Sequence, residues 1–270
     1  MSDFTYLLHS ENLARDALLT MANASTTYPI SNIAVTPISK PFRTTEGKIK
    51  DQKIRIDFPV AKAVDTFALI NHNLTSSATI TIKGGSSPDP DGTDYTTTIT
   101  HAEQTAWKIL SSSESWRYWS IEIDDETNYE GYIQVGYVML GVATEMAHGF
   151  ATNWSVQRQT NIRMIENTFL QPMVGRRISR GSSVTLTFHG LTDALKTTLD
   201  NFLLDLQKWR DPMIFWPDTD ETEGFFGRLN VNHSVDRFRP GVTNIVNVEF
   251  MSDGIDARIL EDPLFWYEPA

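Results

Sequence analysis

The sequence predicts a mostly β protein built from two modules, with one α-helix flanking the sheet of the second. Three observations support this fold class. Up to about residue 148 the apolar residues recur with a period of two, and no convincing amphipathic helix interrupts them. After that point, strand-like segments flank one strong helical segment, Leu191–Trp209. Turn-rich spacers separate the short segments of the first half, which is typical of an antiparallel sandwich.

The first module is predicted from alternation between apolar and polar residues. Its clearest apolar sets share one face of a strand each: Ile54, Ile56 and Phe58; Ile80 and Ile82; Trp119, Ile121 and Ile123; Ile133, Val135 and Tyr137. The segments 83–92 and 124–131 are rich in Gly, Pro, Asp, Asn and Ser, and we expect turns there, including one at Gly84–Gly85. This pattern places one face of each strand in a core and the other in water.

The second module is predicted from the helix and its flanks. Thr192 is a suitable N-cap and Asp193 suits the first turn, because negative charge is favourable at a helix N-terminus. Strands are expected at 183–188 before the helix, and at 231–235 and 245–250 after it, the last two joined through Arg239-Pro-Gly241. The apolar face of the helix should pack on the sheet; it comprises Leu195, Leu199, Phe202, Leu203 and Leu206.

These patterns give four segments. Residues 1–26 are expected to form an N-terminal arm that is either an imperfect helix or extended. The first sandwich covers residues 27–148, the second module covers 149–255, and an aromatic C-terminal tail covers 256–270.

Composition excludes several classes of protein. The chain has 270 residues, no cysteine and a formal charge of −11, so it has no disulfides and no thiol chemistry, and its overall charge argues against a basic face for phosphate. No basic region followed by an apolar stretch opens the sequence, and the apolar run at 137–143 is far shorter than the roughly 20 residues of a membrane helix. We therefore expect no specific nucleic-acid binding, no membrane insertion, and folding in a reducing cytosol.

Residues able to perform chemistry do not form a recognisable catalytic or metal-binding pattern. The loop with Asp89, Asp91 and Asp94 lacks the spacing of a calcium-binding EF-hand, so a solvated turn is the better interpretation. The histidines are scattered, without a paired motif. A second acidic cluster consists of Asp218, Asp220, Glu221 and Glu223. We expect no cofactor, no metal and no enzyme, with hydrolysis by this cluster as the weakest alternative.

Aromatic residues are the better candidates for binding. Trp119 is in phase with Ile121 and Ile123 and should be core. Less constrained aromatics could contact a glycan or a partner protein, namely Trp107, Trp116, Tyr129 and Tyr132. Assembly contacts are expected from the C-terminal tail, at Phe265, Trp266 and Tyr267.

Two stretches of the first module resemble a known family. Residues 65–82 and 116–124 are similar to strands of discoidin-like (galactose-binding-like) jelly-roll sandwiches, and this resemblance spans about residues 27–145. The segments "LINHNL" and "RYWSIEIDD" resemble the corresponding strand sequences of such modules in bacteriophage tail proteins. The second module, with "HGLTDALKTTLDNFLLDLQKWRDPMIFWPD", resembles by its order of elements the tail-tube-like sandwich with one flanking helix.

The resemblance implies a structural protein of a phage virion tail, in the tail tip, distal tail or baseplate region. Such a protein would form a homo-oligomeric ring, hexameric or trimeric, through strand edges, the N-terminal arm and the aromatic tail. It would link the tail tube and baseplate hub to tip or fibre proteins, and would be assembled in the host cytoplasm. The chain departs from the usual distal-tail layout, in which the ring-forming module comes first. The alternative is a carbohydrate-binding adhesin module for host surface glycans.

Overall fold

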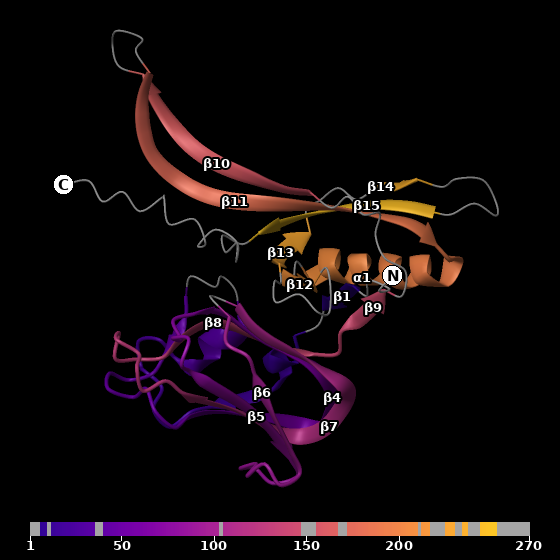
Figure 1. Ribbon diagram of the computed structural model, residues 1–270. Helices are drawn as coiled ribbons and strands as arrows, with labels where there is room; N and C mark the ends of the chain where they lie inside the picture. Colours follow the sequence, from indigo (N-terminus) through magenta and orange to yellow (C-terminus); the bar gives the residue numbers. More distant parts are fainter. Residues whose placement is uncertain are drawn as a thin grey trace. The chain divides into compact units, whose positions relative to one another are not determined.

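The computed structural model describes residues 6–9, 12–35, 40–102, 105–146, 155–166, 172–209, 212–216, 225–229, 234–236 and 244–252. The chain divides into two compact units, one of residues Glu11–Ala143 and one of Met1–Ser10 with Thr144–Ala270 (Figure 1). Both units are built on antiparallel sheets and the described part contains one α-helix, so the predicted fold class is confirmed. No helix in the described ranges has the length and apolar character needed to span a bilayer.

The unit Glu11–Ala143 contains a seven-stranded sheet in the order β3-β8-β4-β7-β5-β6, with β2 paired to β4. Its elements, in chain order, are the 3₁₀ helix η1 (Leu13–Asp16), β2 (Leu18–Thr20), the 3₁₀ helix η2 (Ile30–Ala34), β3 (Phe42–Arg43), β4 (Gln52–His72), β5 (Thr79–Gly85), β6 (Tyr95–Ile99), β7 (Thr105–Asp124) and β8 (Gln134–Gly141).

The two long strands β4 and β7 pair with each other and bend, so that their two halves contribute to the two layers of the sandwich. β4 has 21 residues and β7 has 20, and their pairing is irregular between Asp57 and Lys62 and again between Val64 and Thr66. Such irregularities bend a strand pair, and Figure 1 shows β4 and β7 curving around side by side. The first half of β4 then lies with the second half of β7 and β5, and its second half pairs with β8.

The core lies between these two halves. The apolar faces predicted on β4, β5 and β7 are buried, and Trp119 is fully buried against the rings of Phe67 and Tyr95 at centroid distances of 5.1 and 5.8 Å. Gly84 and Gly85 do not form the predicted turn but end strand β5. The reason is steric, because a Cβ on Gly84 would lie 2.6 Å from Trp116 Cδ1 and 2.9 Å from Trp119 Cζ3. The strand can pass these two rings only at a glycine.

The second unit contains an eight-stranded sheet in the order β10-β11-β15-β13-β12-β1-β9, with β14 paired to β15. Its elements are β1 (Tyr6–His9), β9 (Thr144–Met146), β10 (Ser155–Glu166), β11 (Pro172–Leu191), α1 (Asp193–Trp209), β12 (Pro212–Trp216), β13 (Phe225–Leu229), β14 (Ser234–Asp236) and β15 (Asn244–Ser252).

The helix α1 has the predicted cap and the predicted face. The Leu195 amide donates to the Thr192 hydroxyl over 3.3 Å, which is an N-cap hydrogen bond. Leu199, Phe202 and Leu203 are buried, and α1 contacts β13 and β11. The side chain of Leu206 lies outside the described residues.

The region expected as an N-terminal arm divides between the units. Tyr6–His9 form β1, which is inserted between β12 and β9 of the second sheet, whereas η1 and β2 belong to the unit Glu11–Ala143. Leu8 pairs with both Phe215 and Thr144. The chain therefore leaves the second sheet after β1 and returns to it in the neighbouring strand β9, and the whole unit Glu11–Ala143 is an insertion between them.

Candidate functional site

The loop between β7 and β8 is pinned by a buried carboxylate. Asp125 is 1% exposed. It accepts hydrogen bonds from the Thr75 amide over 2.9 Å, from the Asn128 side-chain amide over 3.1 Å, and from the Thr75 hydroxyl. Hydrogen bonds to a charged acceptor are stronger than neutral ones, so Asp125 ties the start of this loop to the segment after β4.

Two asparagines complete the fixing of this loop. The Asn128 side chain donates to the Asn73 carbonyl over 3.1 Å and accepts from the Glu130 amide over 3.0 Å. The Asn73 side chain donates to Glu130 Oε2 and to the Tyr132 carbonyl, over 2.8 and 2.9 Å, and accepts from the Gln134 amide over 2.7 Å. The loop from Asp125 to Tyr132 is therefore held in one conformation by side-chain hydrogen bonds.

This rigid loop presents Tyr129 to solvent. Tyr129 is 88% exposed, which is the highest exposure among the large exposed hydrophobic side chains of the described residues. Glu130 and the hydroxyl of Tyr132 follow it in the same loop. An aromatic ring held in water on an ordered loop offers a flat apolar face together with a hydroxyl group. Because the loop is already ordered, little conformational entropy remains to be lost when a ligand covers this ring.

A second aromatic feature lies beside the end of this loop. The Arg43 guanidinium stacks on Tyr28 at 4.4 Å and on Tyr132 at 4.7 Å from the ring centroids. Its Nε donates to Gln134 Oε1 over 2.8 Å. Burial, followed by a hydrogen bond to Glu130, raises the pKa of the Tyr132 hydroxyl. We call the set Tyr28, Arg43, Tyr129 and Tyr132 the loop cluster.

The loop cluster contains two of the four predicted contact residues, Tyr129 and Tyr132, and excludes the others. Trp116 is half-buried on β7 and packs against Gly84. It precedes the end of β7 at Asp124 by eight residues, a separation of about 26 Å along an extended strand. Trp107 is half-buried further back on β7, paired with Ala68. Tyr28 and Arg43 carry no periodic signal in the sequence and meet only through the fold.

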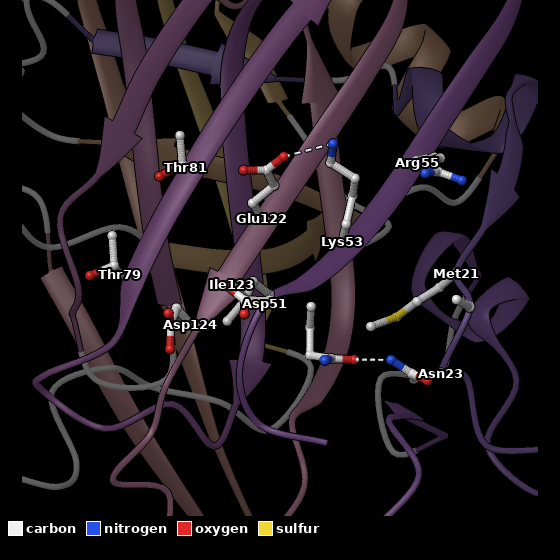
Figure 2. Close-up of a pocket in the computed structure, with 12 residues that line it drawn as sticks. Met21, Asn23, Asp51, Lys53, Arg55, Thr79, Thr81, Glu122, Ile123 and Asp124 are labelled. Carbon is white, nitrogen blue, oxygen red and sulfur yellow. Dashed lines mark hydrogen bonds and ion pairs between the residues drawn. The ribbon is translucent and has the colours of Figure 1, made fainter. Parts of the chain in front are cut away.

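A polar pocket of about 630 Å³ lies on the outer face of β4, β7 and β5. Twelve residues line it: Met21, Ala22, Asn23, Asp51, Gln52, Lys53, Arg55, Thr79, Thr81, Glu122, Ile123 and Asp124. Figure 2 shows the ammonium group of Lys53 turned toward Glu122. The Asn23 side-chain amide donates to Gln52 Oε1 over 3.1 Å. One of its lining residues, Asp124, directly precedes the pinned loop in the sequence.

Three charged side chains of this pocket, Lys53, Arg55 and Glu122, form ion pairs with one another or with Asp89 and Lys83. Lys53 lies 2.8 Å from Glu122 and 2.7 Å from Asp89, and Glu122 also pairs with Lys83 at 2.7 Å. Burial alone would lower the pKa of Lys53 and raise that of Glu122, but these contacts outweigh it, so the pKa of Lys53 is raised and that of Glu122 is lowered. No aromatic ring is among the lining residues, so the pocket offers hydrogen bonds without a stacking surface.

The Asp-rich turn is a structural turn in the described residues. Asp89 pairs with Lys53 and Arg55, Asp91 accepts from the amide and hydroxyl of Thr93, and Asp94 accepts from Ser86. No group of three metal-ligating side chains is found in the described part of the chain.

The sequence analysis missed one histidine pair. His72 and His101 lie with their ring centroids 5.6 Å apart. Burial and the neighbouring His101 lower the pKa of His72 to about 4. The Leu74 amide donates to His72 Nδ1 over 3.3 Å, so His72 is neutral in this contact and holds the start of the segment that Asp125 binds. The acidic cluster Asp218, Asp220, Glu221 and Glu223, and the residues Phe265, Trp266 and Tyr267, lie outside the described residues.

Comparison with solved structures finds carbohydrate-binding modules. A Clostridium perfringens structure described as CpGH89CBM32-6 is 15% identical, with a TM-score of 0.37, over 48% of this chain and 98% of that one. A chitosan-binding module from a Paenibacillus sp. IK-5 chitosanase/glucanase is 17% identical, with a TM-score of 0.40, over 49% of this chain and 99% of that one. The lectin domain of Lectinolysin complexed with Lewis B antigen is 10% identical, with a TM-score of 0.39, over 49% and 96%.

Each match covers about half of this chain and nearly all of the matched one. A scan against models of known protein families finds no match. A search of curated proteins finds none either.

Proposed function

We propose that this chain is a carbohydrate-binding protein and that the unit Glu11–Ala143 binds a glycan, such as one on a host surface, at the loop cluster. The observation that carries the proposal is Tyr129, a ring that is 88% exposed at a loop fixed by a buried carboxylate. Folding gains little from an aromatic ring left in water, whereas a ligand with an apolar face gains a preorganised stacking surface.

The other polar groups of this loop and of the loop cluster suit a ligand rich in hydroxyl groups. The loop cluster adds the hydroxyls of Tyr28 and Tyr132. In the same loop, Glu130 adds a carboxylate, of which Oε2 accepts a hydrogen bond from Asn73. A sugar ring has C–H groups on one face and hydroxyls at its edge, so it can stack on an aromatic ring while it exchanges hydrogen bonds with such groups. The proposal includes no bond-breaking step.

The test is binding of the full chain to a glycan array, followed by titration calorimetry with the oligosaccharides that bind. Tyr129→Ala should weaken binding about tenfold or more, which corresponds to about 1.4 kcal/mol, and Tyr129→Phe should retain most of it. Tyr118→Ala is the matched control, because Tyr118 is a half-buried tyrosine of the same unit outside the loop cluster. If no glycan binds, or if Tyr129→Ala binds as tightly as the unchanged chain, the proposal fails.

A second candidate function is assembly into a phage virion tail, as a ring in the tail tip, distal tail or baseplate region that contacts tail tube, hub or fibre proteins. The observation that favours it is the open edge of the second sheet. In the described residues, β10 has 12 residues and pairs only with β11, and β9 ends the sheet on the other side. Unpaired strand edges are templates for another strand, and two different edges that join copies head to tail can close a ring.

This second candidate is tested by the mass of the particle in solution. Sedimentation of the purified full chain should give one closed oligomer, a hexamer or a trimer, at micromolar concentration. Proline substitutions in β10 at outward-facing amides should reduce it to monomer, since proline removes the donor that a new strand needs. A chain that stays monomeric at every concentration and never joins a tail would exclude this role.

A further inference from the structure

The Arg43 guanidinium is held in one orientation, and no acidic side chain among the described residues pairs with it. The guanidinium stacks on the rings of both Tyr28 and Tyr132, and its Nε donates to Gln134 Oε1 over 2.8 Å. These three contacts fix both the position and the orientation of the group. A guanidinium carries five N–H donors, of which only the one on Nε has a hydrogen-bond acceptor among the described residues.

Two other arginines of the same unit form ion pairs with aspartates. Arg55 lies 2.9 Å from Asp89, and Arg117 lies 3.3 Å from Asp57. Arg43 makes no such ion pair with any described carboxylate. An unpaired cation with a locked plane is suited to an external oxyanion, because the two outer nitrogens match the two oxygens of a carboxylate or sulfate.

Lys48 forms an isolated backbone bridge with Tyr132, so its backbone lies beside that of a member of the loop cluster. The Glu130 carboxylate is engaged within the loop itself, because its Oε2 accepts from Asn73 and its hydrogen bond contributes to the raised pKa of the Tyr132 hydroxyl. Arg43 is therefore the charged side chain of the loop cluster that has no acidic partner among the described residues.

We infer that the glycan bound at the loop cluster is acidic, with a carboxylate or sulfate group held by Arg43 while its sugar ring covers the exposed aromatic face. This inference rests on the proposed carbohydrate-binding function and adds the chemical class of the sugar. Neutral sugars then bind more weakly at the same place, because a hydroxyl oxygen accepts a weaker hydrogen bond from the guanidinium than a charged oxyanion does.

The experiment compares three oligosaccharides of similar length by titration calorimetry on the full chain: an oligogalacturonate, a sulfated galacto-oligosaccharide and a neutral galacto-oligosaccharide. We expect at least one acidic oligosaccharide to bind about tenfold more tightly than the neutral one, a difference of about 1.4 kcal/mol. The two acidic ligands separate a carboxylate from a sulfate preference.

Variants then assign the preference to Arg43. Arg43→Gln should lower the affinity for the acidic ligand to that for the neutral one and change neutral binding less than twofold, and Arg43→Lys should lose most of the preference because lysine lacks the planar fork. Gln134→Ala keeps the arginine but frees its Nε, so it should lose part of the preference. Arg117→Gln is the control, since Arg117 stacks on Tyr118 outside the loop cluster.

The two proposals can fail separately. Equal affinity for the neutral and acidic ligands, or a preference that survives both Arg43→Gln and Gln134→Ala, overturns the acidic class and leaves carbohydrate binding intact. Failure of all three ligands and of the array overturns carbohydrate binding itself. Thermal unfolding followed by circular dichroism identifies any variant that does not fold, and the Gln134→Ala result then decides.

Discussion

Replacing Asp125 with alanine tests whether the loop that carries Tyr129 is held by its buried carboxylate. The change leaves the Thr75 amide without its acceptor, whereas the Asn128 amide keeps its second acceptor, the Asn73 carbonyl. One buried donor left unsatisfied costs about 1–3 kcal/mol. The lost Thr75 hydroxyl contact adds to this, so we expect the loop to be destabilised by about 2–3 kcal/mol.

The assay is hydrogen exchange of the full chain, followed by mass spectrometry of peptides that cover residues 73–78 and 125–132. A local loss of 2–3 kcal/mol should speed exchange in these peptides by about 30- to 150-fold. Asp124→Ala is the matched control, because Asp124 is the adjacent residue and its carboxylate makes no hydrogen bond among the described side chains. Exchange rates that agree within about threefold between the two variants would refute the assignment of Asp125 as the fixing residue.

Two further substitutions test the packing and the titration that surround this loop. Gly84→Ala places a methyl group 2.6 Å from Trp116 Cδ1 and should destabilise the unit by about 1–3 kcal/mol, seen as a lower urea midpoint. Gly85→Ala places one 3.0 Å from Asp94 Oδ2 and 3.5 Å from Pro90 Cβ and should cost less; equal midpoints would contradict the described packing. His72 has a folded pKa of about 4 against 6.5 unfolded, so stability should be constant above pH 6.5 and fall by about 3 kcal/mol as pH drops to 4. In His72→Asn, whose oxygen can still accept from the Leu74 amide, this fall should shrink; an unchanged pH profile between 6.5 and 4 would show that His72 is not its source.

The sequence predicts well those features that depend on neighbouring residues. The alternation of Trp119, Ile121 and Ile123 predicts a buried strand face, and all three are buried. The helical spacing of Leu199 and Leu203 predicts the buried face of α1, which the structure confirms. In each case a local period of two or 3.6 determines which side chains face the core, and local periods can be read from the chain.

Features that depend on distant residues are not predicted. Residues 6–9 carry no signal that they pair with residues 214–216, because register between remote strands is set by tertiary packing. The sequence predicts a turn at Gly84, because the close approach of the Trp116 ring, which leaves no room for a Cβ at this position, arises only in the folded structure. In the same way, Tyr28 and Arg43 join Tyr132 only when the loops meet, so the sequence yields half of the loop cluster.

The most direct test of carbohydrate binding is a crystal structure of the full chain soaked with an oligosaccharide selected on the array. We expect a sugar ring to lie on the face of Tyr129 with carbon atoms within about 4 Å of it. A sugar bound instead in the pocket between Lys53 and Thr79, with Tyr129 left free in solvent, would contradict the account.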